Sequence, residues 1–277
     1  MRKGDNQLSS KQIAAFQRLI YSYYNEHRRD LPWRNTDNPY YIIVSEIMLQ
    51  QTQVERVMEK YGLFLARFPD AVSLTKATLK EVLEVWQGLG YNRRAISLMK
   101  LAGIIVSEYQ GELPADAEKL MKLPGIGHAT AGCLLAFAFH IPSVFIETNI
   151  RRVFIHHFFQ DREGIHDDEI MPLVEVTLDR SNPRDWYYAL MDYGSQLKKA
   201  IDNPNKKSAH YTRHAPFEGS DRKIRGAVLK SLVRKTSMTE EDMIIAISIE
   251  KERIKKILSA LVKEGFIVRA GKTYRIA

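Results

Sequence analysis

The chain has 277 residues, of which 45% are hydrophobic and 27% charged, and its formal net charge is +8. Such a chain can form two or three compact units, and it contains neither the apolar run of a membrane-spanning helix nor the apolar core of a signal peptide, so a cytoplasmic location is expected. The single cysteine, Cys133, excludes a disulfide framework within the chain and any four-cysteine zinc or iron–sulfur site.

Apolar residues recur three or four positions apart over most of the chain, which predicts helices. These helices cover residues 9–28, 39–66, 77–88, 93–109, 115–122, 128–140, 167–180 and 184–200, with a further helix led by Asn149. Glycine-containing turns at 88–91 (GLGY) and 123–127 (LPGIG) separate two of the helix pairs. No alternating pattern typical of strands is comparably strong before residue 265, so the first domain is expected to be all-α.

A polar, basic segment rich in Pro, Asn, Ser and Gly follows at residues 202–220, which predicts a linker or a surface loop. It divides the chain into a first domain, residues 1–201, and a small second domain, residues 221–277. Helices are expected there at 221–235, 239–247 and 250–264, followed by a β-hairpin, which is the outline of a winged helix. Such domains often place the third helix in a DNA groove. The basic side chains on the outer face of that helix are Lys251, Arg253, Lys255 and Lys256; alternatively they are solvated charges, or the domain binds protein.

The segment LPGIGHATAG, residues 123–132, predicts a phosphate-binding hairpin. Gly125 and Gly127 allow a tight turn whose N–H groups approach an anion closely, and the next helix begins at His128, so its positive end faces the same anion. With Thr130, these residues are candidates for contact with a DNA backbone. The excess of Lys and Arg favours such a polyanionic partner, although it also serves solubility.

Five more segments follow in a fixed order: LPWR (31–34), SEIMLQQTQV (45–54), GLGY (88–91), ETNIRRV (147–153) and ALMDYG (189–194). Together with LPGIGxxTA they resemble the adenine DNA glycosylases of the MutY type, a branch of the helix-hairpin-helix glycosylase superfamily. The resemblance covers about residues 10–200. It implies a two-lobed helix-hairpin-helix glycosylase domain that binds double-stranded DNA carrying a mismatched or damaged base pair and cuts the bond between the base and its deoxyribose.

The resemblance also implies roles for individual residues. Glu46 would protonate the flipped adenine, and Asn149 would help to hold the sugar and the attacking water. Gln51 would enter the base stack, and Tyr91 would lie near the opposite base. Residues close to the base pocket would be Trp33 and Arg34.

Elementary chemistry supports the two carboxylic acids of these motifs as the reacting pair. Breaking an N-glycosidic bond requires protonation of the leaving base and stabilisation of an oxocarbenium-like sugar, the two-carboxylate logic of glycoside hydrolysis. Glu46 stands on an apolar helix between Val44 and Ile47, where desolvation should raise its pKa and favour proton donation. Glu147 is the second candidate, whereas Cys133 is expected to be an inert buried thiol.

The chain departs from the family pattern at several positions. Glu147 replaces the family's catalytic Asp, and its extra methylene moves the charge by roughly 1.5 Å. Ala129 occupies the hairpin position that is Lys in bifunctional relatives, so a Schiff-base lyase step is not expected. The four cysteines of the family's iron–sulfur cluster are missing, and no cofactor is expected. Basic residues occupy that region instead: Lys198, Lys199, Lys206, Lys207 and Arg213.

The predicted function is a monomeric, monofunctional DNA glycosylase of base excision repair, acting on adenine opposite 8-oxoguanine or guanine. A winged helix stands where MutY has the domain that helps to recognise 8-oxoguanine. A thymine or uracil mismatch glycosylase on the same scaffold is therefore a second possibility. The third is a DNA-binding or regulatory protein built on a retired glycosylase, which Glu147 and Ala129 would favour.

Overall fold

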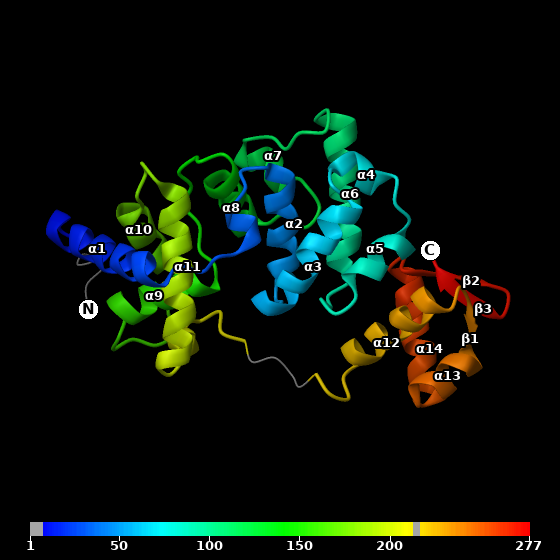
Figure 1. Cartoon of the computed structure of the whole chain (residues 1–277). Coiled ribbons are helices and arrows are strands. Elements are labelled where there is room, and N and C mark those ends of the chain that lie inside the picture. The colour runs from blue at the N-terminus through cyan, green and yellow to red at the C-terminus, as the bar shows by residue number, and fades with distance from the viewer. Residues whose placement is uncertain (1–7, 213–216) are drawn as a thin grey trace. The chain divides into compact units, whose positions relative to one another are not determined.

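The computed structural model describes residues 8–212 and 217–277 (Figure 1). Its elements up to residue 212 are α1 (Ser10–His27), η1 (Pro32–Arg34), α2 (Pro39–Leu49), α3 (Val54–Arg67), α4 (Ala71–Thr75), α5 (Leu79–Trp86), α6 (Arg93–Glu108), α7 (Ala117–Met121), α8 (His128–Ala138), α9 (Thr148–Phe158), α10 (Asp167–Thr177), α11 (Pro183–Ala200) and η2 (Pro204–Lys207). The later elements are α12 (Asp221–Arg234), β1 (Met238–Thr239), α13 (Glu240–Ile247), α14 (Lys251–Lys263), β2 (Ile267–Ala270) and β3 (Thr273–Ile276).

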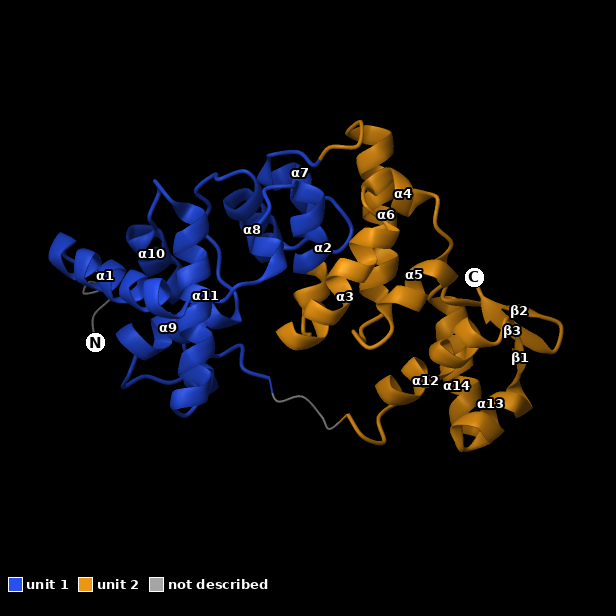
Figure 2. Ribbon diagram, in the orientation of Figure 1, with its two compact units in different colours: residues 1–46, 113–213 blue, residues 47–112, 214–277 orange. Residues whose placement is uncertain are grey.

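The chain forms two compact units (Figure 2). Unit 1 comprises residues 1–46 and 113–213, and unit 2 comprises residues 47–112 and 214–277. The C-terminal helices and strands therefore belong to the same compact unit as α3–α6. No described helix is long and apolar enough to cross a membrane.

The core of unit 1 is aromatic and surrounds α11. Trp186 and Tyr187 are completely buried there, and the ring of Tyr188 stacks on that of Phe137 with centroids 4.3 Å apart. Gly132 of α8 is required at this place, because a Cβ on it would lie 2.5 Å from the Phe145 ring. The core thus holds α8, which carries Cys133, firmly against α11.

The apolar pattern over residues 39–66 predicted one helix, but the structure has two, α2 and α3, with a break between them. Gln51 lies in the break with a left-handed backbone, at φ 56°, which the helical spacing did not reveal. The short helix α4 was not predicted, and the other α-helices of the first 201 residues agree with the predicted ranges to within a few residues at their ends.

The C-terminal part of unit 2 is a winged helix, which confirms the predicted fold class of an all-α domain followed by a small domain with a β-hairpin. Its three strands form an antiparallel sheet in the order β1-β3-β2, with Ile267 opposite Ile276. Thr239 is the N-cap of α13, and its hydroxyl accepts a hydrogen bond of 3.1 Å from the Asp242 amide. The core of this part contains the buried residues Val228, Leu232, Ile254, Leu258, Leu261 and Phe266.

Candidate active site

Glu46 lies on α2 among completely buried apolar neighbours, including Val44 and Ile47. Glu46 as a whole is only partly buried, unlike these neighbours. Desolvation raises the pKa of Glu46 to about 7; the nearby charge of Glu147 acts in the same direction, whereas a hydrogen bond from Cys133 and the charge of Arg34 oppose the shift. A carboxylic acid with such a pKa is still about half protonated near neutral pH and can donate its proton.

Cys133 of α8 is buried, as the sequence predicted, and it also contacts a residue of the candidate site. Its thiol is hydrogen-bonded to the carboxyl of Glu46. Burial raises the pKa of the thiol well above its usual range, so Cys133 remains protonated and acts as the donor in this bond. The contact fixes the side chain of Glu46 without supplying a full charge.

Glu147 caps the N-terminus of α9 with its side chain. Its Oε1 accepts hydrogen bonds from the amides of Asn149 (2.7 Å) and Ile150 (2.9 Å), and its Oε2 accepts one of 3.2 Å from the Asn149 side-chain amide. Burial raises the pKa of Glu147, and these amides together with Arg152 and Arg151 oppose that shift. Glu147 thus has three donors and two neighbouring cations that favour its ionised form, whereas Glu46 has a thiol and one cation.

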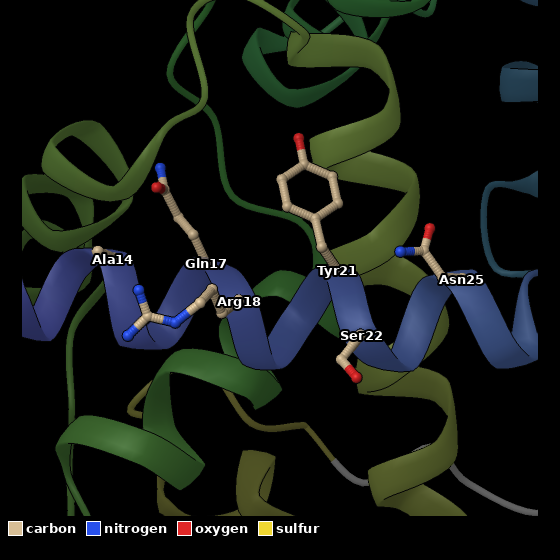
Figure 3. A pocket seen from close by; sticks show the side chains of 6 residues that line it. All are labelled: Ala14, Gln17, Arg18, Tyr21, Ser22 and Asn25. Atoms are coloured by element: carbon tan, nitrogen blue, oxygen red, sulfur yellow. The ribbon is translucent and has the colours of Figure 1, made fainter.

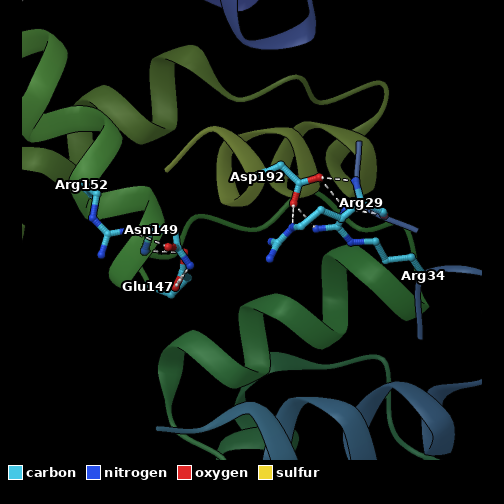
Figure 4. A network of polar contacts seen from close by, with 6 residues as sticks. All are labelled: Arg29, Arg34, Glu147, Asn149, Arg152 and Asp192. Atoms are coloured by element: carbon cyan, nitrogen blue, oxygen red, sulfur yellow. Dashed lines mark hydrogen bonds and ion pairs between the residues drawn. The ribbon is translucent and has the colours of Figure 1, made fainter. Parts of the chain in front are cut away.

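Arg152 fixes Asn149 from the other side (Figure 4). Its Nη1 donates hydrogen bonds of 2.7 Å to the side-chain oxygen of Asn149 and to the carbonyl of Gly194. At Gly194 the backbone of α11 touches that of α9, because a Cβ there would lie 2.4 Å from the carbonyl oxygen of Asn149. The glycine of the ALMDYG motif is therefore a requirement of this close approach.

A second network in Figure 4 is centred on Asp192 of α11, which is 3% exposed. Its carboxylate accepts two hydrogen bonds from Arg34, of 2.7 and 2.8 Å, and two from Arg29, of 2.6 and 3.0 Å. The guanidinium of Arg34 also lies 4.4 Å from the ring centroid of Tyr188. Asp192 and Tyr188 therefore hold Arg34 in place. Trp33, its neighbour, is buried.

The hairpin before α8 has the expected geometry of a tight glycine turn. Gly125 has φ 85°, and Gly127 is the residue at which α8 is capped, directly before His128. Both glycines and His128 are exposed, and Thr130 is half-buried. The first amides of α8 therefore reach the surface of unit 1, where an anion can approach them.

Gln51 and Tyr91 lie in unit 2, on two exposed loops. Both have left-handed backbones, with φ of 56° and 45°, which is a strained conformation for residues other than glycine. Arg94 holds both loops. Its guanidinium donates to the carbonyls of Ile47, Met48 and Gln50 at 2.6–2.8 Å, to the Thr52 hydroxyl at 2.8 Å, and to the carbonyls of Leu89 and Gly90 at 3.3 and 3.1 Å.

Arg94→Ala is expected to destabilise unit 2 by about 3–5 kcal/mol, because it leaves several buried carbonyls without a donor. Arg93→Ala is the matched control, since the side chain of Arg93 is 73% exposed and its ion pair should contribute about 1 kcal/mol or less. Urea unfolding of the two variants checks the prediction. Equal midpoints would show that the bonds of Arg94 are not the source of loop stability.

A hollow of about 630 Å³ lies along α1 (Figure 3). Two of its lining side chains are bonded to the end of α10 and the segment after it: Gln17 donates to the carbonyl of Thr177, and the Tyr21 hydroxyl donates to Asp179. None of the candidate site residues lines it. The hollow is therefore separate from the proposed chemistry.

The residues do not fit an iron–sulfur cluster. The chain has one cysteine, which is buried against Glu46, and among the described residues no three His, Cys, Asp or Glu side chains are grouped to hold a metal ion. Lys198, Lys199 and Lys206 are exposed in the region that carries the cluster in relatives, and Lys206 pairs with Asp202 at 2.6 Å. Lys207 donates to the carbonyl of Gln160, and Arg213 lies outside the described residues.

Comparison with known proteins assigns the family. Residues 44–178 match the model of the HhH-GPD superfamily base excision DNA repair proteins. An adenine DNA glycosylase of Mycolicibacterium smegmatis is 32% identical over 267 residues, covering 90% of this chain and 91% of the relative. The chain therefore belongs to the HhH-GPD superfamily of base excision DNA repair proteins, and its relatives place it with the MutY-like adenine DNA glycosylases.

Another relative is matched over only part of its length, and a solved structure shares the fold. The adenine DNA glycosylase of Buchnera aphidicola subsp. Baizongia pistaciae is 36% identical over 189 residues, but the chain spans only 53% of its length. A solved structure of a thermostable thymine-DNA glycosylase shares the fold with a TM-score of 0.64 and 26% identity, covering 71% of this chain and 92% of that one.

Several residues that organise the site were not predicted. Asp192 stands inside the ALMDYG motif, where a lone acid in an apolar helix was a usable signal. Arg94 and Arg152 carried no such signal, because a basic residue on a polar helix face resembles an ordinary solvated charge. The bond between Cys133 and Glu46 joins residues 87 positions apart and depends on the tertiary fold.

Proposed function

We propose that this chain is a monofunctional DNA glycosylase that releases adenine opposite 8-oxoguanine or guanine. The observation that carries the proposal is the contrast between the two carboxyl groups. Glu46 is desolvated, with a pKa of about 7, whereas Glu147 receives three hydrogen bonds at the N-terminus of α9. One carboxyl is suited to donate a proton and the other to carry a negative charge.

In the proposed reaction Glu46 transfers its proton to a ring nitrogen of the flipped adenine. The bond between the sugar C1′ and the base then breaks, and its electron pair leaves with the base. Glu147 stabilises the resulting sugar cation and accepts a proton from the water that adds to C1′, with Asn149 orienting that water. The products are free adenine and an abasic site. Ala129 offers no amine, so no Schiff base forms.

DNA binding is assigned to the exposed loops. The glycine turn of Gly125 and Gly127, with His128 and Thr130, would hold a phosphate. Gln51 would fill the space left by the flipped base, and Tyr91 would lie at the opposite base. Trp33 and Arg34 would border the base pocket, where Asp192 keeps the Arg34 guanidinium in position.

We propose that the chain has three parts. Residues 1–201 form the glycosylase domain, residues 202–220 a basic connection in place of the cluster loop, and residues 221–277 the winged-helix domain. The protein acts as a monomer in the cytoplasm and without a cofactor.

A thymine or uracil mismatch glycosylase is the second candidate function. The fold shared with the thymine-DNA glycosylase, and a thymine/uracil-DNA glycosylase of Methanothermobacter thermautotrophicus that is 27% identical over 190 residues, support it. A retired, purely DNA-binding protein is the third candidate. The two differently tuned carboxyl groups, which binding alone does not require, weigh against it.

Single-turnover cleavage of duplex oligonucleotides separates the three candidates. Each duplex carries one pair: adenine opposite 8-oxoguanine or guanine, thymine or uracil opposite guanine, or hypoxanthine. Hot alkali reveals abasic sites, and Glu46→Gln is the inactive control. Adenine release that the control lacks is the expected result. Release of thymine or uracil instead would move the assignment to the second function, and tight binding without any release would move it to the third.

A further inference from the structure

A groove of about 830 Å³ lies within unit 2. Three segments supply most of its lining: the loop of residues 50–53, the GLGY turn with the start of α6, and α12 with Phe217 before it. The groove therefore joins the two loops that Arg94 holds to the first helix of the winged helix. The basic residues of α14 do not line it.

Positive charge dominates this groove. Its cationic residues are Arg56, Arg93, Arg94, Arg222, Lys223, Arg225 and Lys230, and its only acidic lining residue is Glu264. Glu264 is engaged by two of them, with bonds of 2.8 Å from Arg93 and 2.6 Å from Arg225, which connect α6 with α12. Arg56, Arg222 and Lys230 are exposed. Such a lining suits a polyanion better than a neutral or cationic ligand.

Aromatic and hydrogen-bonding groups accompany the charge. Tyr91 is 41% exposed and Phe217 is 58% exposed, so both rings can stack on a base. The guanidinium of Arg222 donates a hydrogen bond of 3.3 Å to the Tyr91 hydroxyl. Arg222 thus brings a planar array of donors from α12 to the edge of the Tyr91 ring. The combination of stacking rings, cations and a planar donor is suited to a nucleic acid strand.

Resting on the proposed glycosylase function, we propose that this groove holds the DNA strand opposite the flipped base and that Arg222 selects the base there. With Tyr91 beside that base, Arg222 donates to the O6 and N7 acceptors of a guanine, a pattern that adenine and the pyrimidines lack. 8-Oxoguanine lacks it as well, because its N7 carries a hydrogen, so this contact favours guanine among the opposite bases of the proposed function. The winged helix then contributes to recognition of the mismatch through α12.

The sequence predicted that the third helix of the winged helix, α14, contacts DNA, whereas here the contact is assigned to α12. On α14, Arg253 pairs with Asp221 at 2.8 Å and Lys255 with Glu252 at 3.2 Å. Those contacts occupy two of the four basic side chains expected to reach DNA. Lys251 and Lys256 are exposed but do not line the groove.

Affinity for four duplexes tests the proposal with the full chain. Each duplex carries a tetrahydrofuran abasic-site analogue opposite guanine, adenine, cytosine or thymine, so binding is measured without turnover. The wild type should prefer guanine, and Arg222→Ala should reduce that preference about tenfold, the effect of one lost bidentate contact. Lys256→Ala, the matched change on α14, should leave the preference within about twofold of the wild type. Circular dichroism confirms that the variants are folded.

Lys230→Ala tests the contact of the groove with the DNA backbone. This variant should weaken binding to all four duplexes alike, because the charge of Lys230 contacts phosphate and not a base. The slope of log affinity against log salt concentration should decrease by about one. An unchanged preference in Arg222→Ala, or its loss in Lys256→Ala, would overturn the assignment to α12 while leaving the glycosylase function intact. A wild type with no affinity for any duplex would overturn both.

Discussion

Glu46→Gln is expected to slow single-turnover adenine release by about 10³-fold, within the range usual for the loss of a positioned general acid. The amide has nearly the same shape and its oxygen can still accept the hydrogen bond of Cys133, but it has no acidic proton to give to the base. Affinity for an abasic-site duplex should stay within about threefold of the wild type. A variant that keeps the wild-type rate would remove Glu46 from the mechanism.

The pH profile of the wild type should report the same proton. Glu46 works in its protonated form and its pKa is about 7, so the rate should fall about tenfold per unit as the pH rises well above 7. A decrease at low pH is also expected, because Glu147 works in its ionised form and burial raises its pKa. Glu46→Gln should lack the fall above pH 7. Rates measured by rapid quench between pH 5 and pH 9 would check it, and a wild-type rate that continues to rise above pH 7 would contradict a proton-donating role.

Stability should depend on pH with a sign that follows from the raised pKa. The folded state holds the proton of Glu46 up to about pH 7, whereas the unfolded chain releases it near 4.5, so stability is lost as the pH rises through this window. At pH 8 Glu46→Gln should therefore be more stable than the wild type by on the order of 1–3 kcal/mol, and at pH 4 the two should be alike. Glu241→Gln, which changes an exposed carboxylate on α13, should show no such difference.

The fold was largely predictable because the apolar residues of long amphipathic helices recur three or four positions apart in the sequence. The elements that escaped are short or depend on distant partners. α4 has five residues and is held by the capping box of Asp70 with Ser73, and β1 has two residues whose pairing requires Tyr274 and Thr273 at the end of the chain. The left-handed turn at Gln51 follows from the bonds of Arg94, which lies about forty residues later.

The site was predictable as a set of motifs but not as a set of contacts. The apolar neighbours of Glu46 were visible in the sequence and indicated its raised pKa. The thiol of Cys133 beside it was not, because a buried cysteine in an apolar helix looks the same with or without a polar partner. Likewise the sequence identified Arg34, but its two bonds to Asp192 join residues 158 positions apart.

Glu147→Gln is expected to slow base release by about 10²–10³-fold, because a neutral amide cannot balance the charge of the sugar cation. It should also cost about 1 kcal/mol of stability, since one of its two polar atoms becomes a donor and faces the side-chain amide of Asn149, which donates to Glu147 in the wild type. Single-turnover rates and thermal unfolding measure the two effects separately.

Glu147→Asp tests whether the length of the side chain matters when the negative charge is kept. Aspartate keeps the charge and is a preferred N-cap residue, but its carboxylate is drawn back by roughly 1.5 Å. Because Glu147 caps α9 through the same amides that an aspartate would use, we expect the variant to remain folded and to react within about tenfold of the wild type. If Glu147→Gln reacts as fast as Glu147→Asp, the role of Glu147 is limited to capping α9. The cation would then have to be stabilised without it, and Glu46 would remain as the single reacting carboxyl group.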